Sequence, residues 1–251
     1  LMLGDFIFLP AHQTVNFATK SVRMYGEPVP HHVVFRCPVG GHRGYGATHS
    51  QSVQKHFIGV PNLDLFELSP LHDMTRLLPW LLARGTPAIL FESKTLYGQQ
   101  RFAGRSLDEL FGVHWLDDDA LTAGASIDRQ AQSLLVTTGG MFAACHQAAR
   151  QLFLEFEIAV RIVVPFQLYP FDASVLPRDL PVYVVEESTS GGTWAAEVAA
   201  AISLQWPQRR ERVTSLHSAD EIIPSARHLE RQMLLQVEDI VRRIAEDVLD
   251  G

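Results

Sequence analysis

The 251-residue chain contains very little cysteine. Cys37 and Cys145 are the only two, and they lie far apart without forming a CxxC pair. This scarcity excludes a disulfide framework and a zinc knuckle, and it favours a reducing compartment, which we predict to be the cytoplasm. The chain also lacks an apolar run of the ~20 residues that cross a bilayer, and no leader is recognisable, so we expect no membrane partner.

Positive charge is sparse and scattered. There are 21 Lys and Arg residues against 28 Asp and Glu, which gives a net charge of −7. A nucleic-acid binding protein needs a basic stripe that neutralises phosphates, so we expect no nucleic-acid partner. A composition of 47% hydrophobic and 20% charged residues is typical of a globular protein with one large or two smaller domains.

The motifs of self-contained enzymes are also missing. The glycines of GGHRGYG, residues 40–46, match neither GxGxxG nor GxxxxGK followed by Ser or Thr, and no HExxH or GxSxG string occurs. Despite eleven histidines we predict no metal site, because neighbours such as His31 and His32 would point to opposite faces of a strand. Because no motif supplies a complete set of catalytic residues, we expect this chain to contribute only half of an active site.

Strand and helix patterns alternate along the chain. The apolar spacing predicts, in order, helix 8–25, strand 31–38, helix 49–59, strand 63–69, helix 71–85 and strand 87–94. Residues 99–132 interrupt this rhythm and predict a connecting segment. The alternation resumes at residue 133, where the pattern predicts a strand and turn at 133–140, strands at 158–166, 180–188 and 209–216, helices at 141–155 and 193–206, and a long final helix at 230–249. This order predicts an α/β fold of two doubly wound domains, each built around a buried parallel sheet.

The string STSGGTW, residues 188–194, joins a predicted strand to a predicted helix. Free backbone N–H groups at the start of such a helix can hold an anion. We favour a simpler interpretation, in which the string is a tight turn and a Ser or Thr side chain caps the helix. We expect Glu186 and Glu187, which precede this turn, to be structural.

Several strings, read in order, resemble one family. Residues 2–26, 33–70 and 87–98 closely resemble the β subunit, or fused β half, of the thiamine-diphosphate-dependent component that decarboxylates 2-oxo acids in the 2-oxo acid dehydrogenases. The most specific string is THSQS together with the glycine-rich segment that precedes it, and PFDASVLP is a second marker. The second half, including TTGGMFAACHQAARQL and VYVVEESTSGGTWAAEVAA, resembles the C-terminal domain that this subunit shares with transketolases.

The resemblance implies a division of the chain into domains. Residues 1–98 correspond to a pyrimidine-binding domain whose N-terminal part is absent, and residues 133–251 to a transketolase C-terminal-like domain. Between them, residues 99–132 form the connecting segment, where the resemblance is weakest. The first residues, LMLGDFIFLP, start within an apolar run without an initiator Met. We therefore expect that an earlier part of the chain precedes Leu1.

The resemblance also implies a cofactor and partners. In this family, thiamine diphosphate lies between the pyrimidine domain and the diphosphate-binding domain of an α chain or domain, in a heterotetramer-like assembly. The GDG motif that holds the diphosphate and Mg²⁺ belongs to the α side, and LGDF at residues 3–6 is not that motif. The expected acceptor is a lipoyl-bearing acyltransferase or an acyl carrier protein.

Two residues match functional positions of the family. His49 matches the active-site histidine of the HSQ string, and at a helix N-terminus the helix dipole would favour its neutral form. A neutral imidazole can donate a hydrogen bond to a developing oxyanion or exchange a proton. Phe6 matches the aromatic residue that lies against the aminopyrimidine ring of the cofactor, although it could also be an ordinary core residue beside Phe8.

Two family features are not found at their positions. The Glu that activates the cofactor would lie before Leu1, so either a segment is missing or the usual activation is impossible. Some members hold a structural potassium ion with a carbonyl of the strand at Val33 and an acidic residue where this chain has Arg84. Because a guanidinium would repel the cation, we expect no ion there.

The sequence leaves three functions open. The first is the β half of a thiamine-diphosphate enzyme that decarboxylates a 2-oxo acid and passes the acyl unit to a lipoyl-type carrier. The second is transketolase-like transfer of a two-carbon ketol unit to a carrier protein in a specialised biosynthetic pathway. The third is a non-catalytic assembly subunit, which the absent Glu would explain.

Overall fold

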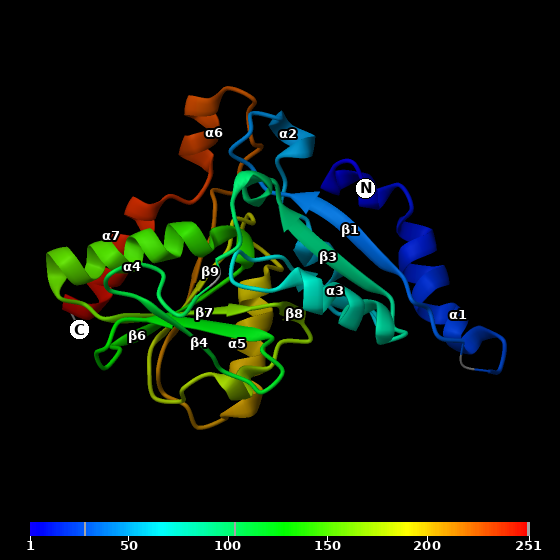
Figure 1. Cartoon of the computed structure of the whole chain (residues 1–251). Coiled ribbons are helices and arrows are strands. Elements are labelled where there is room, and N and C mark those ends of the chain that lie inside the picture. Colours follow the sequence, from blue (N-terminus) through cyan, green and yellow to red (C-terminus); the bar gives the residue numbers. More distant parts are fainter. Residues whose placement is uncertain (28, 103, 250–251) are drawn as a thin grey trace.

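The computed structural model describes residues 1–27, 29–102 and 104–249. Two mixed sheets, with helices around them, form the molecule (Figure 1). The strands are β1 (Val34–Val39), β2 (Asp64–Glu67), β3 (Ala88–Ser93), β4 (Gly112–Trp115), β5 (Thr122–Ser126), β6 (Ser133–Thr137), β7 (Val160–Pro165), β8 (Gln167–Tyr169), β9 (Val182–Val185) and β10 (Val213–Leu216). The predicted α/β fold class is confirmed.

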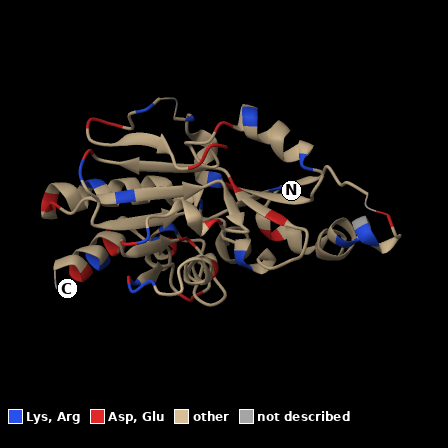
Figure 2. Ribbon diagram, turned by 90° about the horizontal axis from the view of Figure 1, so that it is seen from below, with Lys and Arg blue, Asp and Glu red and all other residues tan. Residues whose placement is uncertain are grey.

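The helices include several short 3-10 and π segments. They are η1 (Gly4–Phe8), η2 (His12–Ala18), α1 (Thr19–Met24), α2 (Gly46–His49), η3 (Gln54–Phe57), α3 (Met74–Ala83), η4 (Lys94–Gly98), η5 (Gly139–Met141), α4 (Phe142–Phe156), η6 (Ala173–Val175), α5 (Trp194–Gln205), α6 (Arg227–Met233) and α7 (Val237–Leu249). No helix of the described residues is long and apolar enough to cross a membrane. Lys and Arg are interspersed with Asp and Glu along the described ribbon (Figure 2).

The first sheet has the strand order β1-β3-β2-β8. β1, β2 and β3 are parallel, as the continuous apolar runs predict, while β8 is antiparallel to β2. β8 comes from the second half of the chain, so this sheet is completed by a strand more than 70 residues away. Phe166, just before β8, packs against Phe66 of β2 with 5.1 Å between ring centroids. The two halves of the chain therefore share one core at this edge.

The second sheet has the order β10-β9-β6-β7-β5-β4. Its first four strands are parallel, whereas β5 and β4 form an antiparallel extension. The connecting segment predicted for 99–132 therefore contains two strands of this sheet. β5 has the sequence TAGAS, whose small residues give no strand-like apolar pattern, so local periodicity could not identify it. α4 and α7 pack together against this sheet (Figure 1).

Three predicted helices differ from the structure. The helical region at 8–25 is confirmed only from His12 to Met24, as η2 followed by α1. The helix predicted for 49–59 is replaced by α2 and η3, separated by the non-helical residues 50–53. The long helix predicted for 230–249 is broken between α6 and α7, where the Ser218 hydroxyl accepts a hydrogen bond from Leu235 N. In the last two cases contacts that are distant in sequence outweigh helical propensity.

A buried histidine links the segment after β2 to the residue that precedes β5. The Nε2 of His72 donates to the carbonyl oxygen of Leu121 at 3.0 Å, and its Nδ1 lies 2.6 Å from the Ser69 hydroxyl. A carbonyl only accepts, so Nε2 carries the hydrogen and Nδ1 accepts from Ser69. Burial lowers the pKa of His72 from 6.5 to about 4.

We expect this histidine to make the fold acid-sensitive. The unfolded chain takes up the His72 proton below about pH 6.5 and the folded chain only near pH 4, so the free energy of unfolding falls over this interval by up to about 3 kcal/mol. Urea unfolding at a series of pH values measures this loss. The variant His72→Gln should lose most of the slope, whereas His12→Gln, at an exposed position, should keep it. Equal slopes in all three proteins would contradict the assignment.

Candidate functional site

The predicted site residues lie beside the carboxyl end of β1. The loop after β1 runs through residues 40–52 and contains α2, which lies close to η1 at the start of the chain (Figure 1). Ligands of open α/β sheets bind at the carboxyl ends of the strands, so this is a physically favourable place for a site. The structure brings Phe6 and His49 together there.

His49 is held by a carboxylate. Its Nδ1 lies 2.8 Å from Oδ1 of Asp5, and the His49 side chain remains about one-third exposed. An ionised carboxylate only accepts hydrogen bonds, so Nδ1 carries the hydrogen of this pair. The second ring nitrogen, Nε2, is then free to accept or donate a proton, because no described residue bonds to it. This is the arrangement of an oriented general acid or base.

The position of His49 within its helix differs from the prediction. His49 is the last residue of α2, a helix of only four residues, and not the first residue of a longer helix. The expected effect of a helix N-terminus on the imidazole is therefore wrong. The backbone beyond His49 leaves the helical path because Gln51 O accepts from Gly40 N, and Ser50 and Ser52 donate to carboxylates of the second half of the chain.

Phe6 lies against the His49 ring. The two rings meet edge to face, with centroids 5.5 Å apart and an interplanar angle of 76°. Phe6 is only partly buried, unlike its neighbour Ile7, which belongs to the core. An aromatic ring that is supported on one side and accessible on the other suits a flat heterocycle. Its contact with the cofactor stays a prediction beside the alternative of a structural ring.

A buried lysine fixes the backbone of His49. Nζ of Lys94, in η4 after β3, donates to the carbonyl oxygen of His49 at 2.6 Å. Burial lowers the pKa of Lys94, and its position near Asp5 and Glu187 opposes that effect. His49 is therefore held at the ring by Asp5 and at the main chain by Lys94.

Two carboxylates from the second half of the chain hold the loop in place. Oε1 of Glu187, after β9, accepts from Gly41 N at 2.6 Å and from the Ser52 hydroxyl at 3.3 Å. Its Oε2 lies 3.3 Å from Nε2 of His42, and this hydrogen bond raises the pKa of His42. Glu187 therefore has the structural role expected for it.

Glu230 of α6 makes the equivalent contacts on the other side of the loop. It is buried and accepts from Gly44 N at 3.1 Å and from the Ser50 hydroxyl at 3.2 Å. Gly46 shows why the loop is glycine-rich, because it has φ +74° and a side chain there would lie 2.5 Å from the Ser225 hydroxyl oxygen. The second half of the chain thus shapes the loop that presents His49.

The other predicted candidates lie outside this cluster. The start of α5 is occupied by the chain's own Glu186, whose Oε1 accepts from Ala195 N at 2.8 Å, while Thr193 caps the helix. The capped-turn interpretation of STSGGTW is therefore confirmed. Arg84 pairs with Asp64 and lies over the Trp80 ring, at the opposite end of β2 from Glu67.

The sequence did not reveal Asp5, Lys94 or Glu230 as parts of the site. Asp5 belongs to LGDF, the string excluded as a diphosphate motif, and its link to His49 spans 44 residues. The Glu230 contacts span up to 186 residues. No single-sequence pattern encodes such pairs. Among the described residues, no group of three or more His, Cys, Asp and Glu side chains could hold a metal ion.

Comparisons with known proteins show relatives at the level of sequence and fold. Residues 124–240 match the family "Transketolase, C-terminal domain". The pyruvate dehydrogenase E1 component subunit beta-1 of Arabidopsis thaliana, named as mitochondrial, is 28% identical over 96% of this chain and 66% of its own length. The 2-oxoisovalerate dehydrogenase subunit beta of Bacillus subtilis is 26% identical over 81% of this chain and 61% of its own length.

Solved structures show the same fold over the whole chain. A split-gene transketolase, described as an inactive beta4 tetramer, has a TM-score of 0.66 and 17% identity, covering 99% of this chain and 74% of its own. A Pichia stipitis transketolase has the same TM-score and identity, with 99% and 33% coverage. The chain spans less than two thirds of the length of the two dehydrogenase β subunits above. It has a transketolase-like fold with distant homology to these subunits.

Proposed function

We propose that this chain, a distant homologue of the β subunits of pyruvate and 2-oxoisovalerate dehydrogenases, is the β half of a thiamine-diphosphate enzyme that decarboxylates a 2-oxo acid. The acyl unit passes to a lipoyl-type carrier, and an α chain or domain completes the site. The observation that carries this proposal is the convergence of Asp5, Phe6 and His49 at the carboxyl end of the first sheet.

The residues present fit one half of the cofactor. Phe6 offers a partly exposed aromatic face beside a polarised imidazole, which suits the pyrimidine ring. As the family resemblance implies, we assign the diphosphate and its Mg²⁺ to the α partner. When bound, thiamine diphosphate supplies a nucleophilic carbon and an electron sink for breaking the bond beside a carbonyl.

The chain's own residues hold and move a proton in this proposal. Asp5 fixes the hydrogen on Nδ1 of His49 and keeps Nε2 directed at the reacting oxygen. Nε2 donates to or accepts from that oxygen and then steers the attack of the carrier. Lys94 and the two carboxylates Glu187 and Glu230 keep the loop in this geometry without touching substrate.

The assembled enzyme tests the substrate class. With the α partner and thiamine diphosphate present, pyruvate and branched 2-oxo acids should each be offered separately, and ketose phosphates in parallel. We expect CO₂ release from at least one 2-oxo acid, dependent on this chain. Turnover of ketose phosphates alone would favour ketol transfer. An absence of cofactor binding, with or without the partner, would favour an assembly subunit.

Removal of the Phe6 ring should weaken cofactor binding. Loss of one aromatic contact in Phe6→Ala raises the Kd for thiamine diphosphate by about 2- to 10-fold in the assembled enzyme. Isothermal titration measures this change. Phe156→Ala, a matched change of a partly exposed ring at the end of α4, should leave the Kd unaltered. An unchanged Kd in Phe6→Ala would return Phe6 to a purely structural role.

A further inference from the structure

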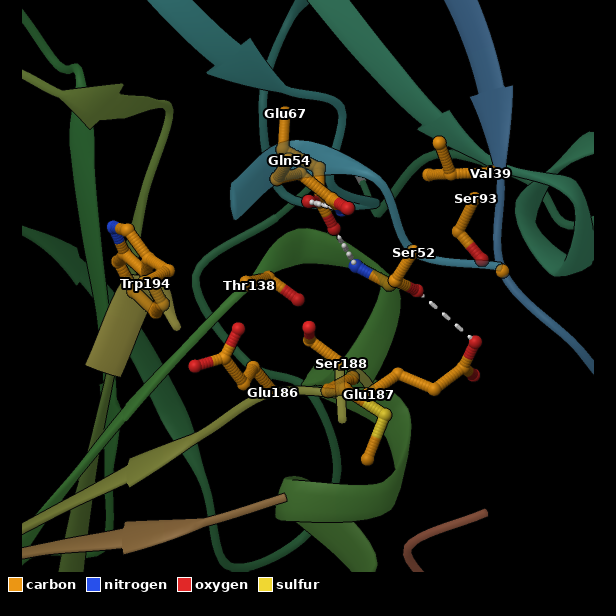
Figure 3. A pocket seen from close by; sticks show the side chains of 13 residues that line it. Val39, Ser52, Gln54, Glu67, Ser93, Thr138, Glu186, Glu187, Ser188 and Trp194 are labelled. Carbon is orange, nitrogen blue, oxygen red and sulfur yellow. Dashed lines mark hydrogen bonds between the residues drawn. The ribbon is translucent and has the colours of Figure 1, made fainter. Parts of the chain in front are cut away.

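A small cavity lies where the carboxyl ends of strands from both sheets meet. Its wall includes Glu67 at the end of β2, Ser93 at the end of β3, and Thr138 and Glu186 just after β6 and β9 (Figure 3). The cavity volume is about 20 Å³, which is room for one water-sized particle. This size excludes an organic ligand and a hydrated divalent ion.

The lining of the cavity is rich in oxygen and negative in charge. It contains the carboxylates of Glu67, Glu186 and Glu187, several hydroxyl groups and the Gln54 amide, and no Lys, Arg or His side chain. Two of the carboxylates are compensated, because Glu186 accepts from Ala195 N at the positive, N-terminal end of the α5 dipole and Glu187 pairs with His42. Glu67 is different.

Glu67 is a buried carboxyl group with only neutral donors. Its side chain accepts from Gly140 N and from Nε2 of Gln54, each at 2.8 Å, and the residue is 1% exposed. No Lys, Arg or His of the described residues forms an ion pair with it. A buried charge without a partner costs several kcal/mol, so an ionised Glu67 requires a cation.

Gln54 supplies the second, independent observation. Its Nε2 is bonded to Glu67, but its Oε1 is buried and has no hydrogen-bond partner among the described residues. Gln54 is 8% exposed and points toward the same space as Glu67 and Thr138 (Figure 3). The Gln54 carbonyl oxygen lacks a donor and the Glu67 carboxylate lacks a positive partner among the described residues. A single cation in contact with both would satisfy them.

We propose that this cavity binds one monovalent cation of the K⁺ type, held by Gln54 Oε1 and the Glu67 carboxylate. Alkali cations take amide, hydroxyl and carbonyl oxygens as ligands. Among the described residues, no group of three or more His, Cys, Asp and Glu side chains could together hold a metal ion, which disfavours a divalent or transition metal. Glu67 belongs to the first sheet and accepts from Gly140 N in η5, just after β6, so the proposed site lies between the two sheets.

This site is independent of the proposed function and of the Arg84 position. It lies at the other end of β2, and neither Phe6 nor His49 lines it. Because residue 140 is a glycine, its backbone can lie close to Ser93 and Glu67. A Cβ atom there would lie 2.8 Å from Cβ of Ser93 and 3.3 Å from Oε1 of Glu67. A proton is the competing occupant, because burial raises the pKa of Glu67 to about 7.

Thermal unfolding in matched salts tests the proposal. At about pH 8.5, where the proton competes least, we expect KCl to raise the Tm of the full chain by about 2–4 °C over choline chloride of equal ionic strength. Parallel measurements in NaCl and NH₄Cl show how the rise in Tm depends on the size of the monovalent cation. Glu67→Gln should lose this response and unfold at a higher Tm than the wild type in choline chloride. Glu246→Gln, at an exposed position on α7, should keep the response.

A crystal of the wild-type chain grown with Tl⁺ in place of K⁺ gives a second readout that requires no variant. We expect an anomalous peak in contact with Gln54 Oε1 and the Glu67 carboxylate. Equal Tm values in KCl and choline chloride, or a K⁺ response that survives in Glu67→Gln, would overturn the proposal. So would a cavity filled by water with no anomalous signal.

Discussion

His49→Ala in the assembled enzyme should lower the rate of acyl transfer to the carrier by about 100- to 10,000-fold, the range typical of a lost general acid or base. Nδ1 of His49 is bonded to Asp5, so Nε2 is the nitrogen of this pair that can exchange a proton. The Asp5 carboxylate cannot replace it once the imidazole is removed. Cofactor affinity should stay within about threefold of the wild type, because the Phe6 ring remains. Single-turnover acyl transfer and thiamine diphosphate titration separate the two quantities.

A neighbouring histidine provides the matched control. His56, in η3, is exposed and contacts only the edge of Phe8 among the aromatic rings of the described residues. His56→Ala should keep the wild-type transfer rate. If His49→Ala transfers acyl groups as fast as His56→Ala, His49 has no part in the mechanism.

Asp5→Asn should lower the same rate by about 10- to 100-fold. The change removes a charge-assisted hydrogen bond at 2.8 Å, worth about 1.5–3 kcal/mol, and lets the imidazole adopt either tautomer. Asp5 acts through its hydrogen bond to His49 and does not contact the reacting group, so we assign it as a positioning residue. Cofactor binding and the Tm should change little.

A spectroscopic readout distinguishes positioning from a purely structural role. The ¹⁵N NMR signals of the His49 ring should report hydrogen on Nδ1 in the wild type and a mixture of tautomers in Asp5→Asn. Asp119→Asn, an exposed carboxyl change after β4, should affect neither the signals nor the rate. A wild-type tautomer in Asp5→Asn, together with a wild-type rate, would remove Asp5 from the account.

Buried parallel strands could be predicted from the sequence because their signal is local. The segments of β1, β3, β6, β7 and β9 are predominantly apolar, and the sequence pattern predicts a strand at each of them. β5 could not be predicted, because TAGAS contains little apolar area and acquires its place only through pairing with β7. The assignment of β8 to the first sheet likewise depends on a contact that is distant in sequence.

The site could be predicted only where one residue carries the signal. Phe6 and His49 stood in strings that resemble a family, and the structure brings them together. The role of Asp5 could not be predicted, because only the fold places its carboxylate beside the His49 ring. The helix expected to begin at His49 failed because Ser50 and Ser52 bond to carboxylates far along the chain, and helical propensity cannot anticipate such partners.

The central claim is that this chain forms one wall of a cofactor crevice and presents His49 to it. The most direct test is a structure of the chain assembled with its α partner, thiamine diphosphate and Mg²⁺. We expect the pyrimidine ring against Phe6, and Nε2 of His49 within about 3 Å of the reacting group or one water away from it. A cofactor bound wholly within one subunit, remote from His49, would contradict the account.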